Sequence, residues 1–408
     1  MFQFRQKGNR TKRGIICLLV IFIIAFSTSG CTTFSNFMSG LEEEEEIPSK
    51  VRIGVFQPLS GEDKDFGELE LQGIELAHEL YPEVLGKPVE LVYGDNNSEI
   101  TAAETIAREL VNKQVSVVLG SYGNTLSLAG GGIFEEAEVP AIAITCSNPL
   151  VTNGNPFYFR VCYVDSFQGI AAAKYIFEDL NEVRAAVMKD RQNDQAAALA
   201  QMFTDKMIAQ TEDDNAVSGS YDYKAGETDF SSQLQSIQSA GIKVVYLPVS
   251  INDAAAIITQ AKALKLDLIF IGTDDWDTKE FLETGGMEIE GALFTSYFDE
   301  DSSFTEMTDA FLTAYKGKYG EDSHPDSAVA LGFDAYILAL DAITRAETAV
   351  NGGAVREKLQ KTKQFQGATG SITFDDNGDP IKSVAVMTVE NGTFVLKSTA
   401  EPIWNPQY

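Results

Sequence analysis

From residue 51 onward, short apolar runs rich in β-branched residues alternate with longer stretches whose apolar residues recur at helical spacing. The first run, Val51–Phe56, predicts a strand, and Gly67–Tyr81 predicts the helix that follows it. Three further strands are predicted at Val89–Tyr93, Val115–Leu119 and Ala141–Ile144. Thr101 and Glu104 have the spacing of a capping box, so we expect them to begin a helix that ends at Lys113. Alternating strands and helices of this kind predict a parallel sheet covered by helices.

A second series of the same kind begins after Asp165. Its strands are predicted at Ala185–Met188, Ala216–Ser220, Val244–Leu247 and Leu268–Ile271, and its helices at 166–180, 195–211, 229–240 and 253–264. From Gly291 the pattern changes to a strand that ends at Ser296. Two long helices and further β-rich pieces follow, at 304–319, 326–345, around Ile372 and at 384–389. We therefore expect two βα lobes of similar size, with a closing segment that serves both.

The N-terminal pattern is that of an export signal. Basic residues precede the apolar run Ile15–Phe26, which is too short to span a bilayer comfortably. The small residues before Cys31 resemble a bacterial lipobox, although Thr28 stands where that motif usually has Leu. The sequence thus predicts a lipoprotein signal peptide at 1–30 and lipidation of Cys31. An acidic tether follows at 31–48, and an uncleaved anchor helix is the alternative. Both place the folded body outside the cytoplasm, anchored to the membrane.

Composition and charge exclude several functions. The chain of 408 residues carries a net charge of −29, which disfavours nucleic acid and anionic lipid as partners. His78 and His324, its two histidines, lie far apart, and neither a GxSxG elbow nor a metal-ligand cluster is present. We therefore expect no enzyme activity, no cofactor and no metal. Cys146 and Cys162 could form a disulfide outside the cell or remain two buried thiols.

Candidate binding chemistry lies where predicted strands end. Polar clusters follow four of them, at Pro58–Gly61, Gly120–Thr125, Thr145–Pro149 and Gly272–Trp276. Ligands of open parallel sheets sit beyond the carboxyl ends of the strands, where the free N–H groups of helix starts suit a carboxylate. Asp274 would suit an ammonium group. The clusters together fit a zwitterion, although each alone is also typical of helix caps and turns.

The order of several motifs resembles the branched-chain amino-acid (Leu/Ile/Val) binding proteins, the type I periplasmic solute-binding proteins of ABC transporters. The similar segments are Leu59-Ser60-Gly61, Phe66-Gly67 and Gln72-Gly73, Gly120 through Pro149, Arg160, Asp165-Ser166, Gln168-Gly169, Ala172 to Ile176, Phe270 to Asp274, and Phe374 to Asp379. The resemblance implies an α/β fold of two doubly wound parallel-sheet lobes joined by three crossovers. We place the N-terminal lobe at 49–164 plus 296–378, and the C-terminal lobe at 165–295 plus 379–408.

The resemblance also implies roles for individual residues. Positions matching Asn124, Thr145 and Ser147 hold the ligand's carboxylate in that family, and the position matching Phe66 covers the ligand. The position matching Asp274 takes the α-ammonium, and the one matching Ser250 lines the pocket.

This chain departs from the family at two positions, because Asp194 and Ser250 stand where Tyr is common. A carboxylate beside an apolar ligand would lose its hydration without gaining a partner. A polar or cationic ligand, or an amide or urea-like solute, avoids that cost.

The sequence therefore predicts a lipid-anchored, extracytoplasmic solute-binding protein of an ABC importer. It would bind a small amino acid or amino-acid-like solute in the interlobe cleft, deliver it to ABC permease subunits and act as a monomer. The alternative with the same fold is an extracytoplasmic ligand sensor that signals to a partner. An exported α/β enzyme or a purely structural surface protein fits the residues less well.

Overall fold

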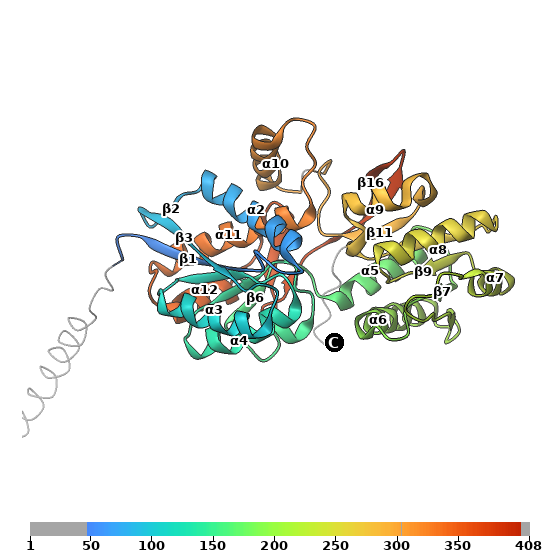
Figure 1. Ribbon diagram of the computed structural model, residues 1–408, viewed down its shortest axis with the longest axis horizontal. Helices are drawn as coiled ribbons and strands as arrows, with labels where there is room; N and C mark the ends of the chain where they lie inside the picture. Colours follow the sequence, from blue (N-terminus) through green and yellow to red (C-terminus); the bar gives the residue numbers. More distant parts are fainter. Residues whose placement is uncertain (1–46, 303, 401–408) are drawn as a thin grey trace, which may run out of the picture. The chain divides into compact units, whose positions relative to one another are not determined.

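The computed structural model describes residues 47–302 and 304–400. They belong to one compact unit, in which strands and helices alternate along most of the chain (Figure 1). The predicted signal peptide at 1–30, the predicted lipidation site Cys31 and most of the predicted tether lie outside the described residues.

The first series of strands forms a mainly parallel sheet. Among the described residues its strand order is β2-β3-β1-β4-β5-β6, with β2 antiparallel to β3. The strands are β1 (Val51–Gln57), β2 (Glu83–Val84), β3 (Lys87–Asp95), β4 (Val117–Gly120), β5 (Ala141–Ala143) and β6 (Tyr158–Arg160). The helices are α2 (Lys64–Leu80), α3 (Ile100–Asn112), α4 (Asn124–Glu136) and the short 3-10 helix η1 (Pro149–Val151). We call this part of the chain the first lobe.

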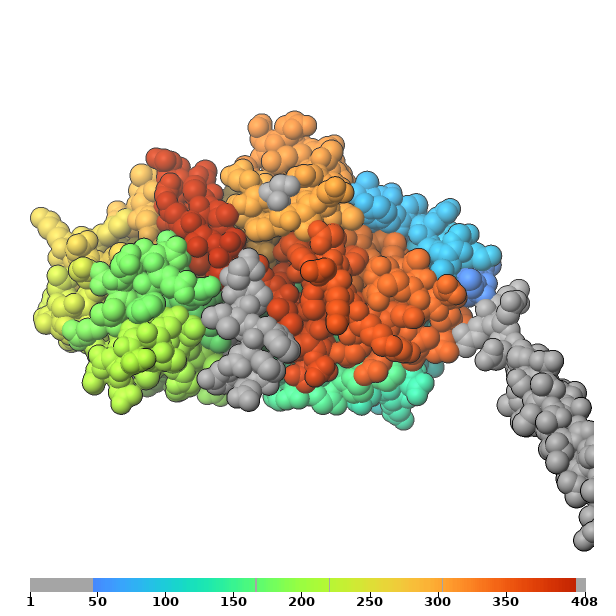
Figure 2. Space-filling model, turned by 180° about the vertical axis from the view of Figure 1, so that it is seen from behind, coloured from blue at the N-terminus to red at the C-terminus, as the bar shows by residue number. Residues whose placement is uncertain are grey.

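The second series forms the sheet of the second lobe. Its strand order in the described part of the chain is β16-β15-β11-β10-β9-β7-β8, and β15 and β16 are the antiparallel strands. The strands are β7 (Ala185–Val187), β8 (Val217–Ser220), β9 (Val244–Tyr246), β10 (Ile269–Gly272), β11 (Leu293–Ser296), β15 (Val384–Glu390) and β16 (Thr393–Ala400). The helices are α5 (Asp165–Glu178), α6 (Asp194–Thr211), α7 (Ser231–Ser239), α8 (Ile251–Ala263) and α9 (Lys279–Gly285), with η2 (Asp274–Trp276) and η3 (Gly286–Ile289). Strand β16 is one edge of this sheet, and in Figure 2 its red residues lie beside the green ones of α5.

The closing segment returns to the first lobe before it completes the second. It contains α10 (Glu306–Tyr319), α11 (Ser327–Ala346), α12 (Gly352–Gln360) and the short strands β12 (Phe365–Gly367), β13 (Gly370–Phe374) and β14 (Pro380–Ile381). The chain therefore passes between the two large sheets after β6, after β11 and before β15. The predicted α/β class with two doubly wound sheets is confirmed. The exact lobe boundaries, at 164/165, 295/296 and 378/379, stay a prediction.

Helices cover both faces of the first sheet because its strands alternate. Val117 and Leu119 pack into one cluster with α2 and α11, whereas Val118 between them packs into the cluster with α3 and α4. The same alternation separates Ile142 from Ala141. Strands that are apolar on both sides in this way are typical of a parallel sheet buried between helices.

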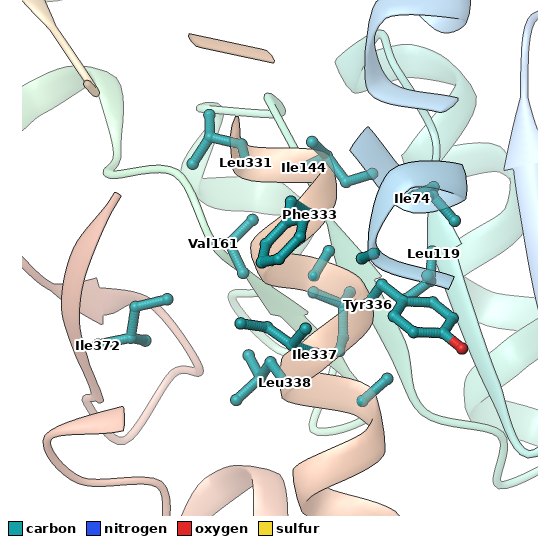
Figure 3. Close-up of a cluster of buried hydrophobic side chains, with 14 of the residues drawn as sticks. Ile74, Leu119, Ile144, Val161, Leu331, Phe333, Tyr336, Ile337, Leu338 and Ile372 are labelled. Atoms are coloured by element: carbon teal, nitrogen blue, oxygen red, sulfur yellow. The ribbon is translucent and has the colours of Figure 1, made fainter. Parts of the chain in front are cut away.

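Helix α11 forms the core of the first lobe. Phe333, Tyr336 and Leu338 pack among side chains from the sheet and from α2, as Figure 3 shows. Of the described helices, α11 alone is long and apolar enough to cross a membrane, but 78% of its most apolar window is buried in the protein. We read it as a core helix.

Helices α2 and α11 touch at backbone distance. A Cβ atom on Gly73 would lie 1.9 Å from the carbonyl oxygen of Val329, and one on Gly332 would lie 2.2 Å from the carbonyl oxygen of Glu70. Only glycine fits at these two positions without a shift of one helix. The contact fixes the height of α2 above the sheet, and with it the position of Glu70.

The predicted capping box at Thr101 is wrong. Helix α3 begins at Ile100 after Glu99, and no side chain caps it. A turn places the Glu99 N–H on the Asn96 carbonyl oxygen, so the helix starts before Thr101, whose own carbonyl oxygen accepts a bond from Thr105. Strand β6 was not predicted, because three residues are too few to show a period.

Candidate functional site

The four polar clusters predicted from the sequence follow β1, β4, β5 and β10. These strands run parallel to their neighbours, so their carboxyl ends lie at the same edge of each sheet. We use the term strand-end site for eight residues at these edges: Phe66, Glu70, Tyr122, Thr145, Ser147, Asp165, Asp274 and Asp275. They are described below in the order in which their hydrogen bonds and electrostatic contacts connect them.

In the first lobe, a chain of hydrogen bonds runs through the buried Glu70. One oxygen of Glu70 accepts a bond of 2.6 Å from the Gln57 amide nitrogen, and the other accepts one of 2.5 Å from the Thr145 hydroxyl. The Gln57 amide oxygen in turn accepts a bond of 2.8 Å from the backbone N–H of Tyr122. Burial raises the pKa of Glu70 to about 7, against the lowering effect of the Thr145 and Gln57 bonds. Glu70 therefore joins three strand ends and changes charge near neutral pH.

The hydrogen bond to Glu70 restricts what the Thr145 hydroxyl can offer a ligand. A hydroxyl group has one hydrogen, and that of Thr145 is donated to Glu70. While Glu70 is ionised, Thr145 therefore presents lone pairs, which suit an ammonium group. When Glu70 is protonated, it can donate to Thr145 and free the hydroxyl hydrogen for a carboxylate.

Two aromatic rings stack beside these polar groups. The rings of Phe66 and Tyr122 lie 4.8 Å apart at an interplanar angle of 4°, and Phe66 is 43% exposed. Burial raises the pKa of Tyr122, and the charges of Glu70 and Asp275 raise it further. Asp275 belongs to the second lobe and Tyr122 to the first, so this electrostatic effect acts between the two lobes.

Helix α4 starts with open amides. Its N-cap is Gly123, so no side chain satisfies the first N–H groups. The side chain of Asn124 instead accepts a bond of 3.2 Å from the backbone N–H of Asn148 and holds the loop after β5 against this helix start.

Asp165 links the two lobes. Its backbone N–H donates to the Ser147 carbonyl oxygen at 3.1 Å, and its carboxylate accepts a bond from Gln195 at 3.1 Å. Burial raises the pKa of Asp165, whereas Ser147, Gln195 and Arg160 lower it. Its second carboxylate oxygen, Oδ1, is buried and has no hydrogen-bond partner among the described residues.

Asp274 lies at the carboxyl end of β10. Its backbone N–H donates to the Gln168 side chain at 3.1 Å, and the same Gln168 oxygen accepts a bond from Thr295 at 2.8 Å. Burial raises the pKa of Asp274, the charges of Asp275 and Asp165 raise it further, and Tyr297 and Gln168 lower it. Asp274 is thus a carboxyl group that pairs with no cation in the described part of the chain.

The structure brings most of the predicted residues to the strand-end site, but it places two elsewhere. The Ser250 hydroxyl caps helix α8 by accepting the Asp253 N–H at 3.3 Å, and its side chain is exposed. Asp194 is exposed in the first turn of α6, which Asn193 caps, and no described residue bonds to its side chain. Among the described residues, neither side chain bonds to a residue of the strand-end site, so their predicted binding roles stay predictions.

The buried cysteines and Arg160 support the site rather than enter it. Cys146 and Cys162 are both buried and free, so they do not form a disulfide in this structure. The fully buried Arg160 forms an ion pair of 2.6 Å with Asp379 and donates to the carbonyl oxygens of Cys146 and Asn148. Its guanidinium is therefore committed to holding the loop after β5.

A cavity of about 420 Å³ is lined by none of the eight residues of the strand-end site. Thr369, Lys382 and Tyr297 are among its lining residues. The Lys382 ammonium donates to the Val161 carbonyl oxygen and to Thr369, so it is already bonded. Tyr297 also lowers the pKa of Asp274, and its side chain therefore borders both this cavity and the strand-end site.

Comparison with known proteins identifies the family. Residues 50–393 match the family model described as "Periplasmic binding protein". The chain belongs to this family, within its branched-chain amino-acid binding group. It is an extracytoplasmic substrate-binding protein and not an enzyme.

Curated relatives span almost the whole chain. A Leu/Ile/Val-binding protein homolog 2 from Brucella abortus is 26% identical over 92% of this chain and 95% of its own length. The leucine-, isoleucine-, valine-, threonine- and alanine-binding protein of Pseudomonas aeruginosa is 25% identical over 84% of this chain and 90% of its own length.

Solved structures show the same fold. The leucine-binding protein LivK of Thermotoga maritima is 35% identical, with a TM-score of 0.74, over 86% of this chain and 99% of its own. A Rhodopseudomonas palustris solute-binding protein in complex with benzoate has a TM-score of 0.71 at 18% identity, over 86% of this chain and 97% of its own. The fold therefore does not by itself decide the solute.

Sequence reasoning missed the most buried part of the site. Glu70 lies on α2 two residues before the Gln72-Gly73 motif, and its spacing alone looks like that of a surface helix position. Tyr122 was seen only as part of a glycine-containing loop. Asp165 was noticed as a motif member without a role, because its proximity to Asp274 depends on how β10 and α5 meet. Asp275 was considered only as half of an acid–base pair with Asp274.

Proposed function

We propose that this protein binds a small amino acid or amino-acid-like solute at the strand-end site and delivers it to the permease of an ABC importer. One observation carries the proposal: Asp165 contacts Ser147 of the first lobe and acts electrostatically on Asp274 of the second. Ser147, which suits a carboxylate, and Asp274, which suits an ammonium group, thus both lie near Asp165.

The two ends of a zwitterion have different partners in this proposal. The open N–H groups at the start of α4, with Asn124 and Ser147, hold the carboxylate. Asp274 holds the ammonium, with a Thr145 lone pair as a second acceptor while Glu70 is ionised. Phe66 covers the solute. Ligand bridging both lobes would shift their equilibrium toward a closed arrangement.

Thermal unfolding of the full-length protein with each of the common amino acids tests the proposal. A solute at a hundred times its dissociation constant adds about 2.7 kcal/mol to the free energy of unfolding. The amide of the best solute lacks the carboxylate, and its deaminated form lacks the ammonium. We expect both analogues to lose most of the stabilisation. Equal stabilisation by either analogue, or none by any amino acid, would contradict the proposal.

The membrane anchor is a separate part of the proposal. Its support is the basic, apolar and small-residue pattern that ends at Cys31, together with the extracytoplasmic location of the family. We expect radiolabelled palmitate to label the wild-type protein in a bacterial host and to spare Cys31→Ser. Labelling of both proteins, or of neither, would exclude Cys31 as the lipidation site.

A further inference from the structure

More carboxyl groups surround the proposed ammonium position than one ammonium can balance. Asp274 and Asp275 are adjacent in the sequence, and the charge of Asp165 raises the pKa of both. Glu70 and Asp275 both act on Tyr122. Burial raises the pKa of each of these four carboxyl groups, and repulsion by neighbouring carboxylates raises the pKa of Asp274 and Asp275 further.

Several buried polar atoms at this site also lack partners. Asp165 is 8% exposed, and its Oδ1 atom has no hydrogen bond within the described part of the chain. The buried hydroxyl group of Tyr246 also has no partner among the described residues, whereas the buried hydroxyl group of Tyr297 interacts with Asp274. Both hydroxyls feel the charges of Asp165 and Asp274, so they lie near these carboxyl groups. A buried polar atom without a hydrogen bond lowers the stability of the folded protein. Several such atoms close together indicate a site that a ligand completes.

Among the described residues, the cationic side chains at the ends of β6 and β7 are bonded to other groups. Arg160 pairs with Asp379. At the carboxyl end of β7, Lys189 pairs with Asp222, and Arg191 donates to the carbonyl oxygens of Asp222 and Tyr223. A cation that arrives with the solute would favour the ionised form of these carboxyl groups and balance their charge.

That charge is organic rather than metallic. No group of three or more His, Cys, Asp or Glu side chains within residues 47–302 and 304–400 could hold a metal ion. The ring of Phe66 stacks on Tyr122 through one face and is 43% exposed, which leaves surface for a cation. Ammonium and guanidinium groups bind well between an aromatic face and a carboxylate.

We propose that the solute is an amino acid with a positively charged side chain, whose second charge lies between Asp275 and the Phe66–Tyr122 ring pair. This inference rests on the proposed function, since it places the α-ammonium on Asp274 and the α-carboxylate at the start of α4. It names the class of solute as basic amino acids. Asp275 decides the specificity in this proposal, because it is the second-lobe carboxylate that acts electrostatically on Tyr122 of the ring pair.

Isothermal titration calorimetry of the full-length protein with L-arginine, L-citrulline and L-leucine tests this inference. Citrulline has nearly the shape of arginine, but its side chain carries no charge. We expect arginine to bind at least about tenfold more tightly than citrulline or leucine. Asp275→Asn should remove that preference and change the affinity for citrulline less than about threefold. Asp214→Asn, at an exposed turn, is the control for general surface charge and should leave all three affinities unchanged.

Titrations in buffers of different ionisation enthalpy supply a second readout. A cation near the carboxyl groups lowers their pKa values, so arginine should displace protons and bind more tightly as the pH rises from 5 to 7. Citrulline should displace fewer protons. An affinity for leucine or citrulline equal to that for arginine would overturn the inference and leave the proposed function intact. An equal loss of arginine and citrulline binding in Asp275→Asn would also overturn it. If no amino acid binds, the proposed function itself fails.

Discussion

Two buried groups of acidic residues show how differently this protein treats a carboxylate. In the first lobe, Asp334 on α11 accepts bonds from the N–H groups of Ala368 and Thr369 and from the Thr369 hydroxyl. Lys382 donates to that hydroxyl. Burial raises the pKa of Asp334, and Lys382 and these bonds act against that rise. At the strand-end site, within residues 47–302 and 304–400, Asp165 keeps an unbonded oxygen, and Asp274 has carboxylates rather than a cation beside it.

The difference separates a structural role from a binding role. Asp334 has as many donors as a buried carboxylate needs, so nothing remains for a ligand to satisfy. The strand-end carboxyl groups are incomplete without a partner and weaken the unliganded protein. Substitutions should therefore act on stability at Asp334 and on affinity at Asp274.

The largest effect is expected for Asp334→Ala. The change leaves the Lys382 ammonium buried without its counterion and two backbone N–H groups without acceptors. We expect a loss of about 3–5 kcal/mol in the free energy of unfolding, measured by urea denaturation. Asp274→Ala is the matched comparison and should leave this free energy unchanged or higher. A loss below about 1 kcal/mol for Asp334→Ala would remove the distinction.

The next effect is a dependence of stability on pH. The pKa of Glu70 is raised from 4.5 to about 7, and that of Asp277 from 3.8 to about 7, each mainly by burial. The folded protein therefore holds these protons more tightly than the unfolded chain. Stability is fully present below the unfolded pKa values and falls as the pH rises to about 7. We expect the free energy of unfolding to fall by about 3 kcal/mol for Glu70 and about 4 kcal/mol for Asp277 between these limits.

Thermal unfolding between pH 4.5 and 8 measures this dependence. Glu70→Gln should flatten the part of the curve near pH 7, since glutamine cannot ionise. A stability that rises with pH over the same interval would contradict the assignment.

A smaller effect is expected on affinity. Asp274→Ala removes the proposed partner of the α-ammonium and should weaken binding of the best amino acid more than about tenfold, which is about 1.4 kcal/mol. Calorimetry measures the change, with Asp214→Asn as the control. Unchanged affinity in Asp274→Ala would mean that the ammonium lies elsewhere.

The smallest effect concerns Ser250, which we predicted in the binding site but whose hydroxyl caps helix α8. Ser250→Ala removes the N-cap of α8 and should cost about 1 kcal/mol of stability, whereas Ser250→Asp keeps a cap. We expect solute affinity to change less than about twofold in both variants. A tenfold loss of affinity in Ser250→Ala would return Ser250 to the binding site.

The fold was more predictable than the site. Strand and helix types follow from local periods, so β1, β4, β9 and β10 were placed within a residue or two. Short elements such as β6 and α9 have no readable period. The polar strand ends were predicted because the ends of parallel strands meet. The hydrogen bond from Thr145 to Glu70 could not be predicted, because it joins a strand end to a helix 75 positions away in the chain.

The close crossing of α2 and α11 has a consequence for changing what this protein recognises. Gly332 sits against the backbone of Glu70, far along the sequence from every residue proposed to touch the solute. A single methyl group there would act as a wedge and tilt the helix that carries Glu70. Selection for new specificity can therefore succeed through a residue that no inspection of the binding surface would choose, and random mutagenesis should include it.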